Sequence, residues 1–78
     1  MNYFGKIIRC HRKKSNLTQI QLADLSGVGK TAVFDIEHGK DTVQFDTFQK
    51  VCEALNISIE LESPIMETCK KEIAHAKS

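Results

Sequence analysis

The stretch TQIQLADLSGVGKTAVFDIEHGK, residues 18–40, decides the fold. Its start predicts a capped helix, because the Thr18 hydroxyl can accept from the amide of Gln21 while the Gln21 side chain reaches back to the Thr18 amide. We expect one helix over 18–25 and a second over 29–37. The segment between them is too tight for a comfortable antiparallel hairpin, so the two helices must cross steeply.

Two further helices flank this stretch, one from about residue 3 to 14 and one from about 46 to 55. Each expected helix is followed by a residue that tolerates the left-handed conformation of a helix end, namely Asn16, Gly27, Gly39 and Asn56. Apolar residues at helical spacing give the expected core: Phe4, Ile7, Ile8, His11, Leu17, Leu22, Ala23, Leu25, Val28, Val33, Ile36, Phe45, Phe48, Val51, Cys52 and Leu55.

After Asn56 the periodicity changes from that of a helix to that of a strand. Ile57, Ile59 and Leu61 alternate with polar residues, which predicts a strand over 57–62 with one buried face. No second strand-like run occurs in the chain, and an unpaired strand leaves its backbone groups unmet. We therefore expect the same strand of a second copy to pair with it, giving a homodimer. The tail, residues 63–78, is expected to be a short helix or a frayed end.

The size and composition of the chain bound its function. Its 78 residues suffice for one small domain, which usually needs a partner or another source of extra stability. Three cysteines without paired spacing argue against a disulfide framework, and no leader or long apolar run is present, so we expect a cytoplasmic protein without a membrane span. Residues 1–16 hold five basic side chains and no acidic one, although the net charge is only +1. This asymmetry suits a domain with one phosphate-facing side.

A steep crossing of two short helices is the geometry of a helix-turn-helix, whose second helix fits the major groove of DNA. The residues that carry it resemble the lambda-repressor-like, or Xre-type, helix-turn-helix family. The resemblance covers about residues 4–61 and rests on 17–19, 22–23, 27–28, Val33 and 37–40, with the helix entry at 45–47. The segment 55–61 is most similar to the HipB-type antitoxins. The family implies a mainly α, four-helix DNA-binding domain over 1–56, with a C-terminal strand that pairs between subunits.

Carried onto this sequence, the resemblance makes Gln19 a phosphate contact at the start of the second helix and Lys40 a contact to the next phosphate. It also implies that Arg12 and Glu37 form a structural ion pair. The start of the recognition helix, Gly29, departs from the Ser or Thr common there and so lacks a side-chain cap. The groove-facing residues of the recognition helix would be Lys30, Thr31, Phe34 and Asp35.

The side chains of the recognition helix suit base contacts. Lys30 can donate to guanine, Thr31 can bond a base edge, and Phe34 can contact a thymine methyl. Asp35 is unfavourable beside phosphates unless it accepts from cytosine. Dimerisation is assigned to Ile57, Ile59 and Leu61.

Enzymatic and metal-binding functions find no support in the sequence. Residues 27–31, GVGKT, imitate a phosphate-binding loop, but Asp24 stands where that motif needs its first glycine. The cysteines and histidines lack finger-like spacing, so we expect no metal, no cofactor and no catalytic residues. The sequence predicts a dimeric repressor of operator DNA, which the resemblance places in a HipBA-like toxin–antitoxin operon with a HipA-like serine/threonine kinase toxin as partner. A module that mainly neutralises the kinase and a phage-type repressor without a toxin are the alternatives.

Overall fold

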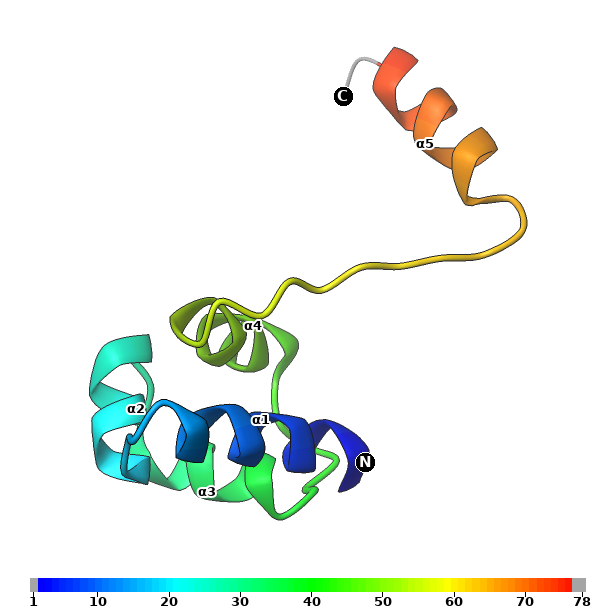
Figure 1. Cartoon of the computed structure of the whole chain (residues 1–78). Coiled ribbons are helices and arrows are strands. Elements are labelled where there is room, and N and C mark those ends of the chain that lie inside the picture. Colours follow the sequence, from blue (N-terminus) through cyan, green and yellow to red (C-terminus); the bar gives the residue numbers. More distant parts are fainter. Residues whose placement is uncertain (1, 77–78) are drawn as a thin grey trace.

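The computed structural model describes residues 2–76, which form five helices. Four of them gather into a domain, and the fifth lies at the end of an extended segment (Figure 1). The helices are α1 (Asn2–Lys14), α2 (Gln19–Ser26), α3 (Lys30–Glu37), α4 (Phe45–Ala54) and α5 (Met66–His75). The first four agree with the sequence prediction to within one or two residues at each end.

The helix ends follow from four residues with left-handed backbone. Asn16 and Asn56 have φ of 58° and 59°, and Gly27 and Gly39 each have φ of 75°. At Gly27 the amide donates back to the carbonyl of Ala23, which closes α2 within a single residue. The sequence prediction of these four turn positions is confirmed.

The core lies where α1, α2, α3 and α4 meet. Leu22 of α2, Val33 of α3 and Val51 of α4 are completely buried and belong to one apolar cluster. The buried apolar residues are Ile8, Leu22, Ala23, Val33, Ile36, Val51, Cys52 and Leu55. All eight belong to the core expected from the sequence.

Four residues of the expected core are exposed instead, namely Phe4, His11, Leu25 and Phe45. His11 was placed inward by helical spacing, yet its neighbour Arg12 is the buried residue, with 9% of its surface exposed. Arg12 can turn inward because its positive charge forms an ion pair with Glu37 at the end of α3. Spacing along a helix identifies an apolar stripe, but it does not tell which part of the stripe the rest of the domain covers.

Helix α1 comes unusually close to the end of α3 at Gly5. A Cβ atom at this position would lie 2.9 Å from the carbonyl oxygen of Glu37 and still nearer to that of Ile36. Both are backbone atoms, which cannot turn aside as a flexible side chain can. Gly5 therefore sets how closely α1 and α3 approach.

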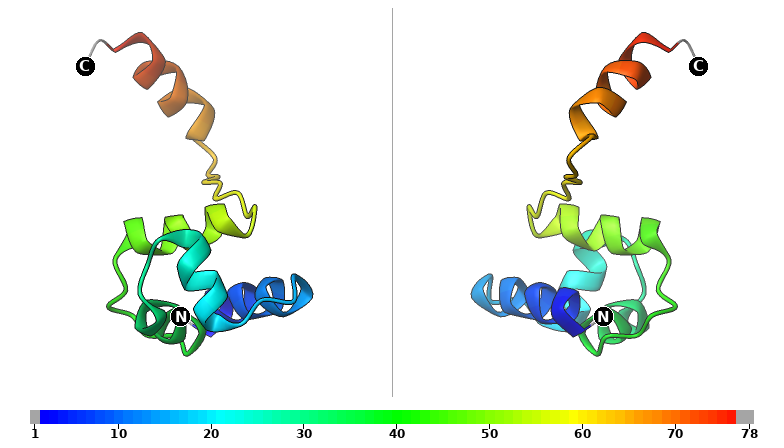
Figure 2. Two further views of the ribbon diagram at one scale, coloured as in Figure 1. Left: turned by 90° about the vertical axis from the view of Figure 1, so that its left-hand side faces the viewer. Right: turned by 90° about the vertical axis from the view of Figure 1, so that its right-hand side faces the viewer.

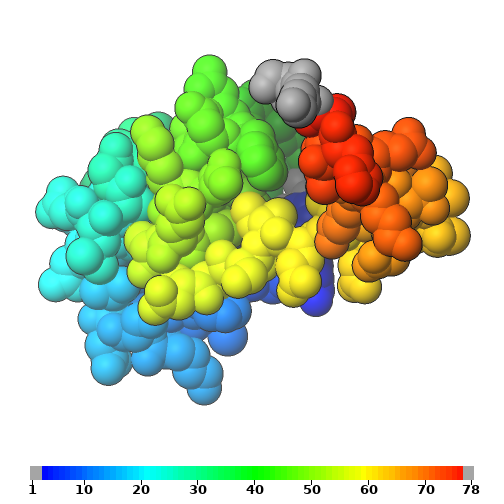
Figure 3. Space-filling model, turned by 90° about the horizontal axis from the view of Figure 1, so that it is seen from above, coloured from blue at the N-terminus to red at the C-terminus, as the bar shows by residue number. Residues whose placement is uncertain are grey.

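The strand predicted over 57–62 is not present: residues 57–64 have neither helix nor strand. A strand requires backbone hydrogen bonds to a neighbour, and no other extended segment of residues 2–76 lies beside this one. The segment runs outward from α4 and leads to α5, which stands clear of the other helices from both sides (Figure 2). Seen from above, the segment of residues 57–64 passes beside α4 on its way to α5 (Figure 3). The expectation of four helices is corrected to five, because the tail contains α5.

Within residues 2–76, no helix combines the length and the apolar character that a bilayer crossing needs.

Candidate nucleic-acid interface

The start of α2 is fixed by the predicted capping box. The amide of Gln21 donates to the Thr18 hydroxyl at 3.1 Å, and the Thr18 amide donates to the Gln21 side-chain oxygen at 2.8 Å. This reciprocal pair satisfies two donors at the helix start. Gln19, the first residue of α2, is held beside it and is partly exposed.

Helix α3 begins after a turn of three residues, 27–29. Gly29 has extended backbone at the cap position and supplies no side-chain hydrogen bond, as the sequence predicted. Val33 and Ile36 hold α3 in the core, and this leaves the opposite side of the helix open. Lys30, Thr31 and Phe34 all lie on that exposed side.

Phe34 does not lie alone on the open face of α3. Its ring stacks on that of His38, with centroids 3.8 Å apart and planes at 22°. The Nδ1 atom of His38 also lies 2.8 Å from the carbonyl oxygen of Phe34. His38 was not predicted as a surface residue of this face, although its spacing of four residues from Phe34 on a helix was a usable signal.

Asp35 has a local partner that accounts for its presence near a basic surface. The Nζ atom of Lys40 lies 3.5 Å from a carboxylate oxygen of Asp35. The Asp35 side chain is 24% exposed and that of Lys40 is 56% exposed, so the pair sits at the edge of α3 where water screens it. The charge of Asp35 is thereby offset without a cytosine.

Arg12 and Glu37 form the ion pair that the family resemblance implied. Arg12 donates through Nε to Glu37 at 2.5 Å and through Nη2 at 2.9 Å, and its Nη1 donates to the Leu17 carbonyl at 2.9 Å. The Glu37 side chain is 1% exposed. Its other contact is Gln19, whose amide nitrogen donates to it at 3.2 Å. One cluster therefore joins α1, the start of α2 and the end of α3.

The pKa values of this cluster record the same contacts. Burial opposes the charged form of Glu37, but hydrogen bonds from Arg12 and Gln19 outweigh it and lower the pKa of the carboxyl, and the charge of Arg9 adds to this lowering. The hydrogen bond to Glu37 raises the pKa of Arg12 in turn. Both groups are therefore charged at neutral pH.

Comparison with known proteins identifies the fold family of this arrangement. The family described as helix-turn-helix matches residues 8–61. The chain belongs to this helix-turn-helix family. It is also similar to an uncharacterised HTH-type transcriptional regulator, y4mF, of Sinorhizobium fredii, with 38% identity over 60 residues that cover 77% of this chain and 79% of the relative.

In this helix-turn-helix protein, α2 and α3 occupy the positions predicted for the two helices of the motif. The predicted contact residues fall into two groups. Lys30, Thr31 and Phe34 share the open face of α3, whereas Gln19 and the Asp35–Lys40 pair lie at its margins. Two of the six, Gln19 and Lys40, are already engaged with acidic side chains.

A second basic surface of the helix-turn-helix domain was missed as a site. Lys6, Arg9 and Lys13 are exposed and recur at helical spacing along the flank of α1 that continues from Gly5 and Arg12. Because Gly5 and Arg12 face α3, this flank adjoins the end of α3. The charge of Arg9 acts on Glu37, which places it beside the cluster that holds Gln19. The excess of basic residues before residue 16 was the signal; the fold shows which of them share a face.

Proposed function

We propose that this helix-turn-helix protein is a sequence-specific DNA-binding transcriptional repressor. The observation that carries the proposal is the open face of α3, where Lys30, Thr31 and Phe34 are presented beyond the capped start of α2. Such a helix fits the major groove, and these side chains suit guanine and thymine edges. Gln19 and the α1 flank, on Lys6, Arg9 and Lys13, supply contacts to the phosphates beside that groove.

Binding of the full chain to the duplex upstream of its own gene tests this proposal. Lys30→Ala should cost about 1–3 kcal/mol of binding free energy, because a base-edge contact is lost. Fluorescence anisotropy at several salt concentrations measures it. Lys50→Ala, which removes an exposed lysine of α4 outside the two helices of the motif, is the matched control. Equal affinities of the two variants would remove Lys30 from the interface.

We further propose that the repressor works as a homodimer through residues 57–62. The apolar alternation of this segment restricts the pairing. Side chains alternate between the two faces of a strand. Ile57, Ile59 and Leu61 of both copies therefore share a face only when odd-numbered residues of one strand lie opposite odd-numbered residues of the other. A ribbon centred on Glu60 would set two carboxylates face to face, whereas one centred on Ile59 pairs Ile59 with itself and Leu61 with Ile57 of the partner subunit. The second register is therefore the one we propose.

This register makes the dimer testable with one substitution. Ile59→Asp places two like charges directly opposite each other across the two-fold axis, so the dimer should dissociate. Ser63→Asp adds the same charge just beyond the ribbon and should leave association unchanged. Sedimentation velocity over a range of concentrations distinguishes the variants. A dimer that tolerates Ile59→Asp would place the interface elsewhere.

The resemblance to HipB-type antitoxins extends the proposal to an autoregulator in a toxin–antitoxin operon, with a kinase toxin of the HipA class as second partner. Its support is the strand-like pattern that follows Asn56. Coexpression with the neighbouring gene tests it. A kinase-like neighbour should copurify with the chain, and Lys30→Ala should keep that complex while weakening operator binding. A neighbour of another kind would leave a repressor without a toxin.

A further inference from the structure

Helix α5 has an apolar stripe that nothing within residues 2–76 covers. Ile65, Cys69 and Ile73 follow one another at intervals of four, so they share one face of the helix, and Ile73 is 73% exposed. No residue of α5 is buried. A helix of ten residues is below the length at which isolated helices hold together in water. Helix α5 therefore needs a surface to dock on.

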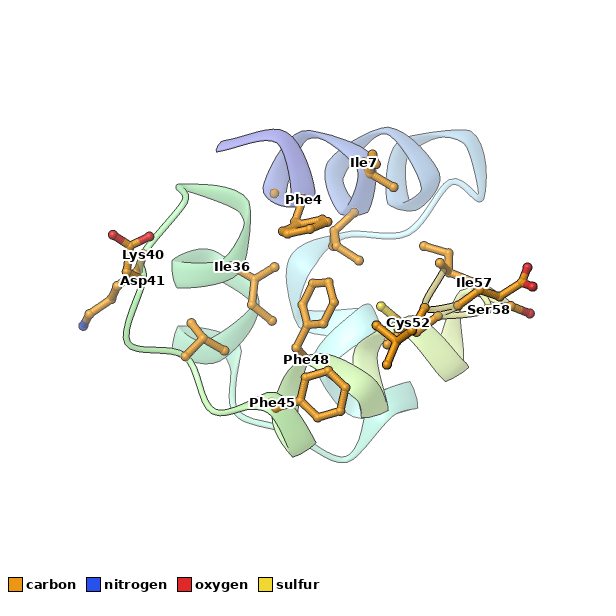
Figure 4. Close-up of a pocket in the computed structure, with 16 residues that line it drawn as sticks. Phe4, Ile7, Ile36, Lys40, Asp41, Phe45, Phe48, Cys52, Ile57 and Ser58 are labelled. Atoms are coloured by element: carbon orange, nitrogen blue, oxygen red, sulfur yellow. The ribbon is translucent and has the colours of Figure 1, made fainter. Parts of the chain in front are cut away.

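The domain offers an apolar groove, of about 570 Å³, between α1, α4 and residues 57–61, with Ile36 and the turn after α3 at its other edge. Phe4 from α1 and Phe45 and Phe48 from α4 converge on it (Figure 4). Phe4 and Phe48 meet edge to face, with centroids 5.9 Å apart. Phe45 remains 63% exposed, and Phe4 48%. These are two of the residues whose exposure contradicted the expected core.

The proposed strand pairing determines which groove each α5 reaches. When the ribbon is centred on Ile59, the end of one strand lies beside the beginning of the other, so Leu61 stands opposite Ile57 of the partner subunit. Ile57, Ile59 and Leu61 all line the groove of their own chain, so the pairing sets the end of one strand at the Ile57 side of the partner's groove. Residues 62–64 then link Leu61 to Ile65, so α5 starts beside the partner's groove, whereas within the single chain α5 stands clear of α1 and α4 (Figure 2).

The area that a stable dimer must bury also favours docking of α5 on the partner subunit. A two-stranded ribbon of this length is marginal by itself in water. Stable dimers bury about 1,200–2,000 Å² in total, which is more than two short strands supply. Two α5 helices laid in two grooves would add the missing apolar surface.

We propose that two copies of this chain exchange α5, so that the Ile65–Cys69–Ile73 stripe of each copy docks in the Phe4–Phe45–Phe48 groove of the other. This inference rests on the proposed dimer and assigns the tail a role in holding it. The occupant of the groove is thus a second copy of the chain, bound through an exchanged arm.

Complementary charges in the full-length chain test the exchange. Ile73→Asp and Phe45→Lys each place a charge in an apolar contact, and each should raise the dimer dissociation constant by roughly tenfold or more, since the contact occurs twice per dimer. An equimolar mixture should restore association, because in the mixed dimer one contact is native and the other joins a carboxylate to an ammonium. Ala74→Asp, the same charge on another face of α5, is the control. Sedimentation velocity measures association, and circular dichroism verifies the fold.

The outcomes separate the exchange from the dimer itself. A wild-type chain that stays monomeric at all concentrations overturns both proposals. A wild-type dimer that responds equally to Ile73→Asp and Ala74→Asp overturns the docking of α5 and leaves the strand-paired dimer standing. Single variants that dissociate without rescue on mixing overturn the exchange, because a helix docked within its own chain gains nothing from a second variant. Rescue on mixing supports the exchange.

Discussion

Replacement of Gly5 by alanine sets two known effects against each other. In an exposed helix interior, Gly→Ala stabilises by about 0.5–1 kcal/mol, because glycine loses more backbone freedom on folding. At Gly5 the new methyl group would meet the Glu37 carbonyl oxygen at 2.9 Å and the Ile36 carbonyl oxygen still closer. Overpacking of this kind costs about 1–3 kcal/mol, and we place Gly5 near the upper end because the contacts are backbone atoms. Gly5→Ala should therefore destabilise by about 2–2.5 kcal/mol net.

Urea unfolding followed by circular dichroism measures this difference, at one protein concentration so that association does not alter the midpoint. Lys6→Ala is the control, since it changes an exposed residue of the same helix and should stay within about 0.5 kcal/mol of the wild type. If Gly5→Ala were as stable as the wild type or more so, the close approach of α1 and α3 would not limit packing, and the reasoning would be wrong.

Two further predictions concern the charges around α3. The pKa of Glu37 is lowered in the fold, so its stabilisation is present above the unfolded pKa of about 4.3 and is lost as pH falls through the folded pKa. Glu37→Gln should be less stable than the wild type at pH 7, with a gap that narrows below about pH 4 in urea titrations; a gap independent of pH contradicts this. Replacing both Arg9 and Lys13 by alanine should lower the slope of log affinity against log salt concentration by about 0.9 per lost phosphate contact, and Lys50→Ala should not; equal slopes would exclude the α1 flank.

Features encoded by neighbouring residues were predictable from the sequence. The capping box and the four left-handed turn residues depend on side chains within three or four positions, so the sequence states them directly. The Arg12–Glu37 pair spans 25 positions, and it was predicted through the resemblance to a family. Local pattern alone would have turned His11 inward.

Features that depend on how the helices approach one another were not predictable. Phe45 has the spacing of a core residue, but an apolar stripe does not distinguish the domain's own core from a surface open to a partner. The Asp35–Lys40 pair needs the turn after α3, and the role of Gly5 needs the position of a carbonyl more than 30 positions away. The segment 57–62 lacks strand structure because the hydrogen-bonding partner of a strand is not within the described chain.

The four left-handed residues that reverse the chain also bear on how quickly it folds. Asn16, Gly27 and Gly39 reverse the chain within a few residues, and most contacts within the described residues join near neighbours in sequence. Helical domains of this kind fold in about microseconds to milliseconds. Association of two chains would instead be a bimolecular step, which becomes slower as the protein concentration decreases. If the proposed dimer is the active form, newly made chains would exist first as folded monomers, and the delay before they act would be set by how many copies the cell contains.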